Sequence, residues 1–439
     1  MGIKRDSFGV FWTGCLLIIL ELVIQITLAR ALGAEARGSF AVCWTFLSIQ
    51  LMFCVFGIGD ANTYSLASSK ATVSQVLGAN IYLAFLSCAI VGSISYQLID
   101  LPYEFFSKAS RVEFLWIIIA LWPWVFSIYL ISILRGKNLY ASMNFIKLAA
   151  PVTSLLGLLV FCYFFRLGVV GAIMARISGP LTVIVFALVK LRSEIHLVEL
   201  FTGGLKQISN TLHYAVRGFL GVLAQTMNIQ LGTILMAFFL ETSEVGFYAI
   251  AMAIVARIWV VPDSICTILM PNLAQKEEVS DEFISRILRL VIIIVSVVSV
   301  GVALISKPFI RFGFGVDFLP VVTAIYILLI GTVARSLTKI ITAYLLAINR
   351  PGTNSAIKLI FVLFYIGLLF ILIPRYGFVG GPLATSFSFV MEMLITILVF
   401  ARISHLKSWR MMIIQKEDFR YIWSNINTLF ARFKRQRQV

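Results

Sequence analysis

The stretch RLGVVGA, from Arg166 to Ala172, returns 209 positions later as RYGFVGG, from Arg375 to Gly381. Two further pairs keep nearly the same shift, Leu32–Gly38 with Leu240–Gly246 and Ile146–Leu148 with Ile357–Leu359. Long apolar runs separate these motifs. Self-similarity at a fixed spacing indicates an internal duplication, and a duplicated membrane protein is typical of transporters.

The composition predicts an integral membrane protein. Hydrophobic residues make up 60% of it, charged residues 13%, and the mean hydropathy is +0.98, whereas soluble domains are about 45–50% apolar. A membrane-spanning helix needs about 20 apolar residues, roughly twice the length of a barrel strand. Because backbone amides in lipid need internal partners, the runs are predicted to be helices. We identify twelve, at 8–31, 39–60, 76–98, 113–134, 144–165, 168–190, 211–239, 245–271, 284–306, 318–346, 355–374 and 378–401.

The duplication divides these helices into two lobes of six. An even number gives both copies the same orientation, so the expected pseudo-two-fold axis runs along the membrane normal, with a central cationic cavity between the lobes. The predicted parts are an N-terminal lobe, a cytoplasmic connecting loop, a C-terminal lobe and a basic cytoplasmic tail, at 1–195, 196–210, 211–401 and 402–439.

Lysine and arginine predict the orientation. They are more frequent in the connections on the amino-terminal side, and nine of them follow Ala401. By the positive-inside rule both termini are expected in the cytoplasm. The formal net charge of +16 is then a topology signal, and no nucleic-acid partner is expected. The tail has two open interpretations, a helix lying on anionic lipid or a partly disordered segment.

The sequence lacks common motifs of enzyme active sites and cofactor sites. There is no phosphate-binding loop, dinucleotide fingerprint or nucleophile elbow. The six cysteines fall inside predicted helices, and neither they nor the three histidines have metal-ligand spacing. We therefore expect no catalytic residues, no metal and no cofactor.

Charges at mid-helix depth are candidates for function, because each is costly in a membrane. Seven lie deep in the predicted spans, namely Glu21, Arg176, Arg217, Arg257, Arg335, Lys339 and Glu392. Arg217, Gly221, Gln225, Asn228 and Gly232 form one polar stripe on span 211–239. Lipid would not accept such faces, so they are predicted to point into the bundle or a hydrated cavity. Charges nearer the span ends, including Arg30 and Lys358, are expected to snorkel to the surface and are given no mechanistic role.

Two interpretations of the deep charges remain open. One is structural ion pairing within each half, Glu21 with Arg176 and Glu392 with Arg335 or Lys339. The other follows from the excess of cations over acids, which predicts that an anion visits the interior. Arg217 and Arg257 are the cations expected to meet it.

The sequence also resembles a known family. GFYAIAMAIVARIWVVPDSICTILMP, from Gly246 to Pro271, YLLAINRPG, from Tyr344 to Gly352, and IPRYGFVGG, from Ile373 to Gly381, are similar to motifs of polysaccharide exporters. These exporters are the O-antigen (Wzx-type) flippases of the multidrug/oligosaccharidyl-lipid/polysaccharide superfamily. The likeness runs from the first span to the last. One departure is that Asn228 and Gln230 stand where relatives often carry an arginine and an acid, so any charge role of that pair is in doubt here.

The resemblance implies a cargo and a place for it. The cargo is an undecaprenyl-pyrophosphate-linked oligosaccharide, moved between the leaflets of the bacterial inner membrane, with membrane lipid and other polysaccharide-assembly proteins as partners. We expect Arg257 and Arg217 to hold the pyrophosphate, and Gln25, Gln225 and Asn228 to touch sugar. Arg335, Lys339 and Arg176 are further substrate-binding candidates, and Glu21 and Glu392 are candidates for proton or sodium coupling.

Membrane potential is the other expected energy source.

Two alternative functions stay open. One is a cation-coupled multidrug antiporter of the same superfamily, which should prefer an acidic cavity. The other is a membrane-bound polymerase or glycosyltransferase, which should have a large catalytic loop.

Overall fold

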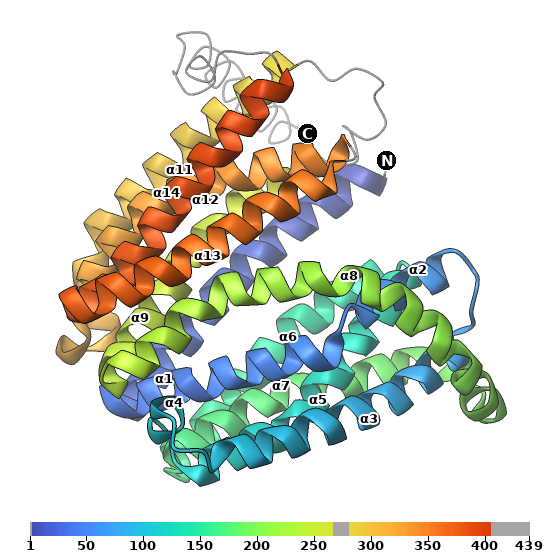
Figure 1. Ribbon diagram of the computed structural model, residues 1–439. Helices are drawn as coiled ribbons and strands as arrows, with labels where there is room; N and C mark the ends of the chain where they lie inside the picture. The colour runs from blue at the N-terminus through green and yellow to red at the C-terminus, as the bar shows by residue number, and fades with distance from the viewer. Residues whose placement is uncertain (1, 267–280, 349, 405–439) are drawn as a thin grey trace, which may run out of the picture. The chain divides into compact units, whose positions relative to one another are not determined.

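The computed structural model describes residues 2–266, 281–348 and 350–404, and every regular element in these ranges is a helix (Figure 1). The α-helices are α1 (Gly2–Val55), α2 (Ile58–Ala67), α3 (Val73–Ile99), α4 (Glu104–Ser107), α5 (Arg111–Gly136), α6 (Tyr140–Leu158), α7 (Gly168–Leu191), α8 (Leu197–Phe239), α9 (Thr242–Val255), α11 (Asp281–Phe309), α12 (Pro320–Ala347), α13 (Pro351–Tyr376) and α14 (Gly380–Ser404). Short π or 3-10 segments are η1 (Leu159–Phe164), η2 (Arg192–Glu194), η3 (Ala256–Trp259), η4 (Ile310–Phe314), η5 (Val316–Phe318) and η6 (Gly377–Val379).

The predicted spans coincide with these helices wherever the chain is described. Within the described ranges, nine helical stretches are long and apolar enough to cross a membrane. One of them, Gly352–Ile403, contains two predicted spans, and another, Leu16–Val55, overlaps most of two. Predicted span 211–239 lies in α8. The prediction of an all-helical, multi-pass membrane protein is therefore confirmed. The two-lobe symmetry and the central cationic cavity stay predictions.

The duplicated glycine motif is a turn that the chain builds twice. Gly168 has φ +58° and Gly377, its duplicate, has φ +55°, a conformation that only glycine adopts without strain. A side chain at Gly171 or at its duplicate Gly380 would overlap the backbone of the helical segment just before the turn. Both copies of the motif thus close a tight hairpin between two apolar helices.

The segment between the predicted lobes differs from expectation. Residues 197–210, predicted as a loop, form the first turns of α8. They are helical because they have a packing partner: a side chain on Gly204 would lie 2.8 Å from the carbonyl carbon of Gly78 on α3. The Thr72 hydroxyl also donates to a carboxylate oxygen of Glu199 at 2.7 Å. This contact joins segments distant in sequence, which helical periodicity cannot reveal.

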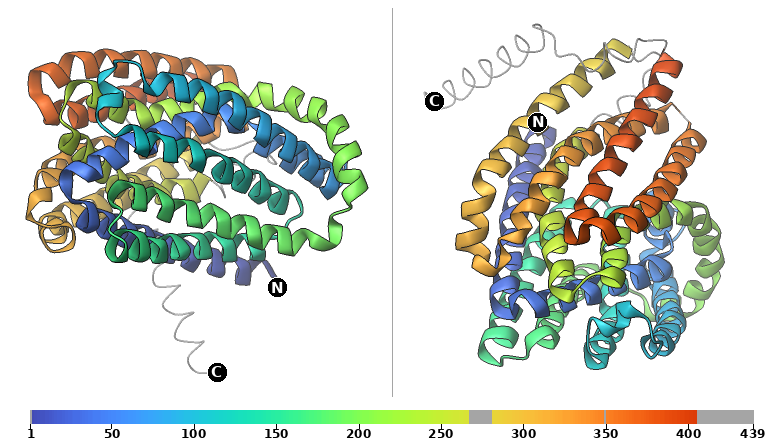
Figure 2. Two further views of the ribbon diagram at one scale, coloured as in Figure 1. Left: turned by 90° about the horizontal axis from the view of Figure 1, so that it is seen from below. Right: turned by 60° about the vertical axis from the view of Figure 1, so that its left-hand side comes forward.

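The chain divides into two compact units. Unit 1 comprises Met1–Met252, Lys307–Ala324 and Leu369–Gly381, and unit 2 comprises Ala253–Ser306, Ile325–Leu368 and Pro382–Val439. In unit 1, α3, α5 and α7 run side by side in both views (Figures 1 and 2). The units do not follow the predicted division at 195 and 211, because parts of the second repeat pack with the first. The lobe boundaries stay a prediction.

Aromatic side chains organise the interior of unit 2. The ring of Phe389 stacks on Phe361 at 6.0 Å between centroids, and the Trp259 ring meets it edge-on at 5.9 Å. Tyr344 and Phe400 form a second edge-on pair at 5.0 Å. Two of these rings lie against cations of unit 2, since Arg335 is 5.2 Å from the centroid of the Phe389 ring and Lys339 is 5.3 Å from that of Trp259.

Candidate functional site

Unit 1 contains a cluster of charged and polar groups on α1 and α7. The Arg176 guanidinium lies 3.8 Å from the Glu21 carboxylate, and both side chains are largely buried. Arg176 also lies over the Trp44 ring, 4.8 Å from its centroid, a cation–π arrangement that stabilises a buried cation. The ion pair predicted between Glu21 and Arg176 is thus confirmed.

Arg37 is a member of this cluster that sequence reasoning missed. It is only 3% exposed, and its Nη2 donates to the Gln25 side-chain oxygen at 2.7 Å. The sequence places Arg37 in a connection between spans, but the structure continues α1 beyond Gly33, whose φ of +74° and ψ of +177° bend the helix. The bend breaks the helical spacing between Gln25 and Arg37, so periodicity could not have paired them.

Two donors in this region are buried without a hydrogen-bond acceptor among the described residues. They are Arg37 Nε and Trp124 Nε1. The Trp124 ring packs edge-on against Trp44 at 5.3 Å. Buried polar groups are normally hydrogen-bonded, so these two N–H donors are candidates for contact with a bound acceptor. We call Glu21, Gln25, Arg37, Trp44 and Arg176 the first charge cluster.

Unit 2 contains a second charge cluster, Asp263, Arg335, Lys339, Lys358 and Glu392. Arg335 Nη1 lies 2.5 Å from Glu392 Oε2, and the Glu392 side chain is 1% exposed. The Lys358 ammonium is 3.7 Å from the other oxygen of Glu392. This confirms the predicted pairing of Glu392 with Arg335. It also corrects the expectation that Lys358 snorkels away from the interior.

Lys339 has a partner that the sequence did not suggest. Its ammonium donates to both carboxylate oxygens of Asp263, at 2.7 and 2.8 Å, so it pairs with this acid rather than with Glu392. It also lies 5.3 Å from the centroid of the Trp259 ring. Asp263 is 76 positions earlier on a different helix, and only the tertiary structure brings the two together.

The remaining predicted site residues belong to η3 and α8. Arg257 is half-buried on η3. The side chains of Arg217, Gln225 and Asn228, on α8, lie outside the described residues. Gln230 on the same helix accepts a hydrogen bond from the Thr45 hydroxyl at 3.3 Å. The assignments to substrate or ion binding at all these positions stay predictions.

The clusters set limits on the chemistry of the site. No group of three His, Cys, Asp or Glu side chains in the described part of the chain is arranged to hold a metal. Each cluster instead combines guanidinium or ammonium groups with at least one carboxylate, and an aromatic ring lies against a cation in each. Such groups bind anions and polar hydroxyls.

The fold defines the protein class as an all-helical, multi-pass membrane protein. The structure is similar to "Lipid II flippase MurJ, inward closed conformation", with a TM-score of 0.70, 16% identity and coverage of 91% of this chain and 89% of that one. It is also similar to an inward-facing multidrug resistance MATE family transporter of the MOP superfamily (TM-score 0.69, 12% identity, coverage 89% and 94%). The eukaryotic MATE transporter AtDTX14 matches with a TM-score of 0.65, 12% identity and coverage of 93% and 98%.

The family follows from the sequence match. Residues 5–277 match the model of the family described as polysaccharide biosynthesis protein. The chain belongs to this family, which confirms the resemblance to polysaccharide exporters. No curated protein matches the chain.

Proposed function

We propose that this protein is a flippase that moves an undecaprenyl-pyrophosphate-linked oligosaccharide, such as an O-antigen repeat unit, from the cytoplasmic to the outer leaflet by alternating access. We place it in the bacterial inner membrane with both termini in the cytoplasm. The observation that carries the proposal is membership of the polysaccharide biosynthesis family. The fold shared with a protein titled lipid II flippase supports it.

The first charge cluster supports an anionic, sugar-bearing cargo. A lipid-linked glycan has a tail that stays in lipid, so only its diphosphate and sugars need shelter from hydrocarbon. Arg37 is buried and its Nε has no acceptor among the described residues, which suits a phosphate oxygen. Arg257 and Arg217 remain our choices for bidentate contacts to the diphosphate, and Gln25, Gln225 and Asn228 for sugar hydroxyls.

Arg335, Lys339 and Arg176 are weaker candidates for substrate. Each already lies beside a carboxylate, with Glu392, Asp263 and Glu21 as the partners. Binding a cargo phosphate there requires displacing an acid.

The energy source is proposed to be the membrane potential or a coupled proton or sodium ion. Each elementary charge that crosses 100 mV contributes about 2.3 kcal/mol, so outward movement of an anionic diphosphate is favoured. Ion binding by Glu392 requires its ion pair with Arg335 to open, and ion binding by Glu21 requires the same of Arg176. Dissipation of both gradients in sealed vesicles should stop transport; unchanged flux would refute coupling.

The test of function is glycan export. Without the protein, lipid-linked repeat units should accumulate on the cytoplasmic face. Arg257→Ala and Arg37→Met should abolish export at unchanged protein level, Arg257→Lys should retain part of it because the guanidinium fork is lost, and the exposed Arg402→Ala serves as control. Full export by both Arg257→Ala and Arg37→Met would overturn the assignment.

A cation-coupled multidrug antiporter is the second candidate, favoured by the fold match to MATE transporters. Drug susceptibility tests it. If a strain without the protein becomes drug-sensitive yet exports glycan normally, the antiporter function is favoured. A membrane-bound polymerase is a third and weaker alternative, since the connections described here are short.

A further inference from the structure

One face of the membrane bundle is held together by contacts between the two repeats. The predicted connections on the side opposite the amino terminus are 32–38, 99–112, 166–167, 240–244, 307–317 and 375–377. All six belong to unit 1, including the three from the second repeat. We call this side the far face; in the proposed orientation it is the outer face.

Arg30 links the repeats at the far face. It lies on α1 of the first repeat, and its Nε donates to the backbone oxygen of Gly313 at 2.6 Å, while its Nη2 donates to the oxygen of Phe312. Both acceptors are on η4, 282 and 283 positions away. The last carbonyls of a helical segment have no partner within it, and a cation there is also favoured by the helix dipole. Arg30 thus forms two charge-assisted hydrogen bonds across the repeat boundary.

A second contact at the far face joins duplicated residues. Gly38 and Gly246 occupy the same position in the two repeats, 208 positions apart. A side chain on Gly246 would lie 2.8 Å from the Gly38 nitrogen, and one on Gly38 would overlap the backbone oxygen of Thr242. Equivalent positions related by a two-fold axis touch each other only near that axis. The contact therefore fits a pseudo-two-fold axis that passes through this point.

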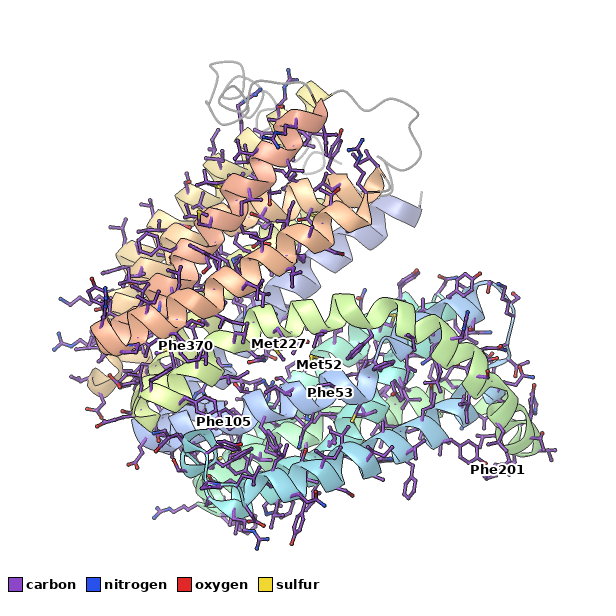
Figure 3. All side chains as sticks on the ribbon, viewed as in Figure 1. Met52, Phe53, Phe105, Phe201, Met227 and Phe370 are labelled. Carbon is purple, nitrogen blue, oxygen red and sulfur yellow. The ribbon has the colours of Figure 1, made fainter. Side chains whose placement is uncertain are left out.

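Aromatic rings from both repeats cover the end of α8 beside this contact. Phe105 of α4 lies 6.1 Å from Phe238, and Phe370 of α13 lies 5.7 Å from Phe239, between ring centroids. Figure 3 labels Phe105 and Phe370 near the carboxyl end of α8. The far face is therefore closed by hydrogen bonds, a backbone contact without side chains, and packed rings.

We propose that these contacts form the far-side gate of the transport path, with Arg30 as its latch and the Gly38–Gly246 contact as its pivot on the pseudo-axis. The inference rests on the proposed function in one respect, because alternating access requires this face to open during each cycle. Arg30 then stabilises the closed state of the far face and does not contact the cargo. The latch is reversible because its acceptors are backbone carbonyls at the end of a π-helical turn, which water satisfies when the guanidinium leaves.

Gate opening is measured by labelling a buried cysteine. Val245, next to Gly246, is fully buried, and Val245→Cys in a background without native cysteines reports its exposure to a membrane-impermeant maleimide. Labelling is followed in intact cells and in inside-out vesicles. Arg30→Ala should raise the labelling rate from the far face severalfold, Arg30→Lys should raise it less, and Gly38→Ala should raise it strongly because its methyl group cannot fit beside Thr242.

Gly301→Ala is the matched control, because a side chain there meets no atom within 4 Å. The proposal fails if Arg30→Ala and Gly38→Ala label at the parent rate. It also fails if Gly301→Ala rises equally, or if labelling increases alike from both faces, since those results indicate general loosening.

Cross-linking separates the gate from the function. A side chain on Gly313 would lie 3.5 Å from the tip of Ile26 on α1, so Ile26→Cys with Gly313→Cys should form a disulfide under copper phenanthroline. The locked protein should neither export glycan nor expose position 245, and reductant should restore both. Full export by the cross-linked protein would overturn the gate while leaving the flippase proposal intact. Absence of export by the uncrosslinked parent would overturn the flippase proposal, and the labelling would still decide the gate.

Discussion

Replacing Glu392 with glutamine should destabilise unit 2 more than any other single isosteric change in the second charge cluster. Glu392 is 1% exposed and Arg335 10% exposed, and their closest atoms are 2.5 Å apart. At an effective dielectric constant of about 20, such charges attract each other by about 7 kcal/mol, much of which offsets the cost of removing them from water. Removing one partner of a buried pair typically costs about 3–5 kcal/mol, because the other charge stays buried.

The matched variant removes both charges. In Arg335→Met with Glu392→Gln the buried guanidinium is absent, and the amide of the glutamine still faces the Lys358 ammonium, which lies 3.7 Å from the Glu392 carboxylate. More than half of the lost stability should therefore return. The assay is the free energy of unfolding from SDS titration in mixed micelles, with thermal unfolding in detergent as a second readout. Glycan export by the double variant also decides whether Arg335 acts on substrate or only on structure.

The reasoning is refuted if Glu392→Gln unfolds at the wild-type SDS fraction. It is equally refuted if the double variant is less stable than the single one, since the loss would then come from packing and not from an uncompensated charge.

The remaining predictions concern weaker contacts. Asp263→Asn should cost no more than about 1 kcal/mol in the same titration, because Asp263 is 58% exposed and exposed pairs contribute little; a loss as large as that of Glu392→Gln would contradict this. Gly168→Ala and Gly377→Ala should each cost about 1–2 kcal/mol, because a methyl group is strained at their positive φ, whereas Gly367→Ala within α13 should be neutral or stabilising. Thr72→Ala should cost about 1 kcal/mol, because it removes the capping box of α3; equal stability of variant and parent would show that the cap is dispensable.

Much of the fold was predictable from the sequence. The twelve apolar runs coincide with helices in the described residues because lipid exposure demands long apolar segments with internal hydrogen bonds. The glycine motif at 166–172 and 375–381 marked a duplicated turn because only glycine adopts the required φ. The start of α8 was not predictable, since residues 197–210 are helical through a glycine contact with α3.

The candidate site was predictable in part. The pairs Glu21–Arg176 and Arg335–Glu392 were proposed from depth and charge alone, because an isolated charge in a membrane interior is costly. Asp263 as the partner of Lys339, and Lys358 beside Glu392, were missed, because neither was counted among the deep charges and Lys358 lies close to the end of its predicted span. Arg37 was missed because the bend at Gly33 brings a residue of a predicted connection into the interior.

By itself the sequence determined that the chain lies in a membrane, that it is helical, that it is duplicated and which family it resembles. Each of these depends on composition or on short-range pattern. Only the tertiary structure decided which acid meets which base, that Arg37 is buried, and that Arg30 and Gly38 bind the second repeat. The physical reason is that pairing and gating depend on contacts between residues up to 283 positions apart, and such contacts leave no periodic trace in one sequence.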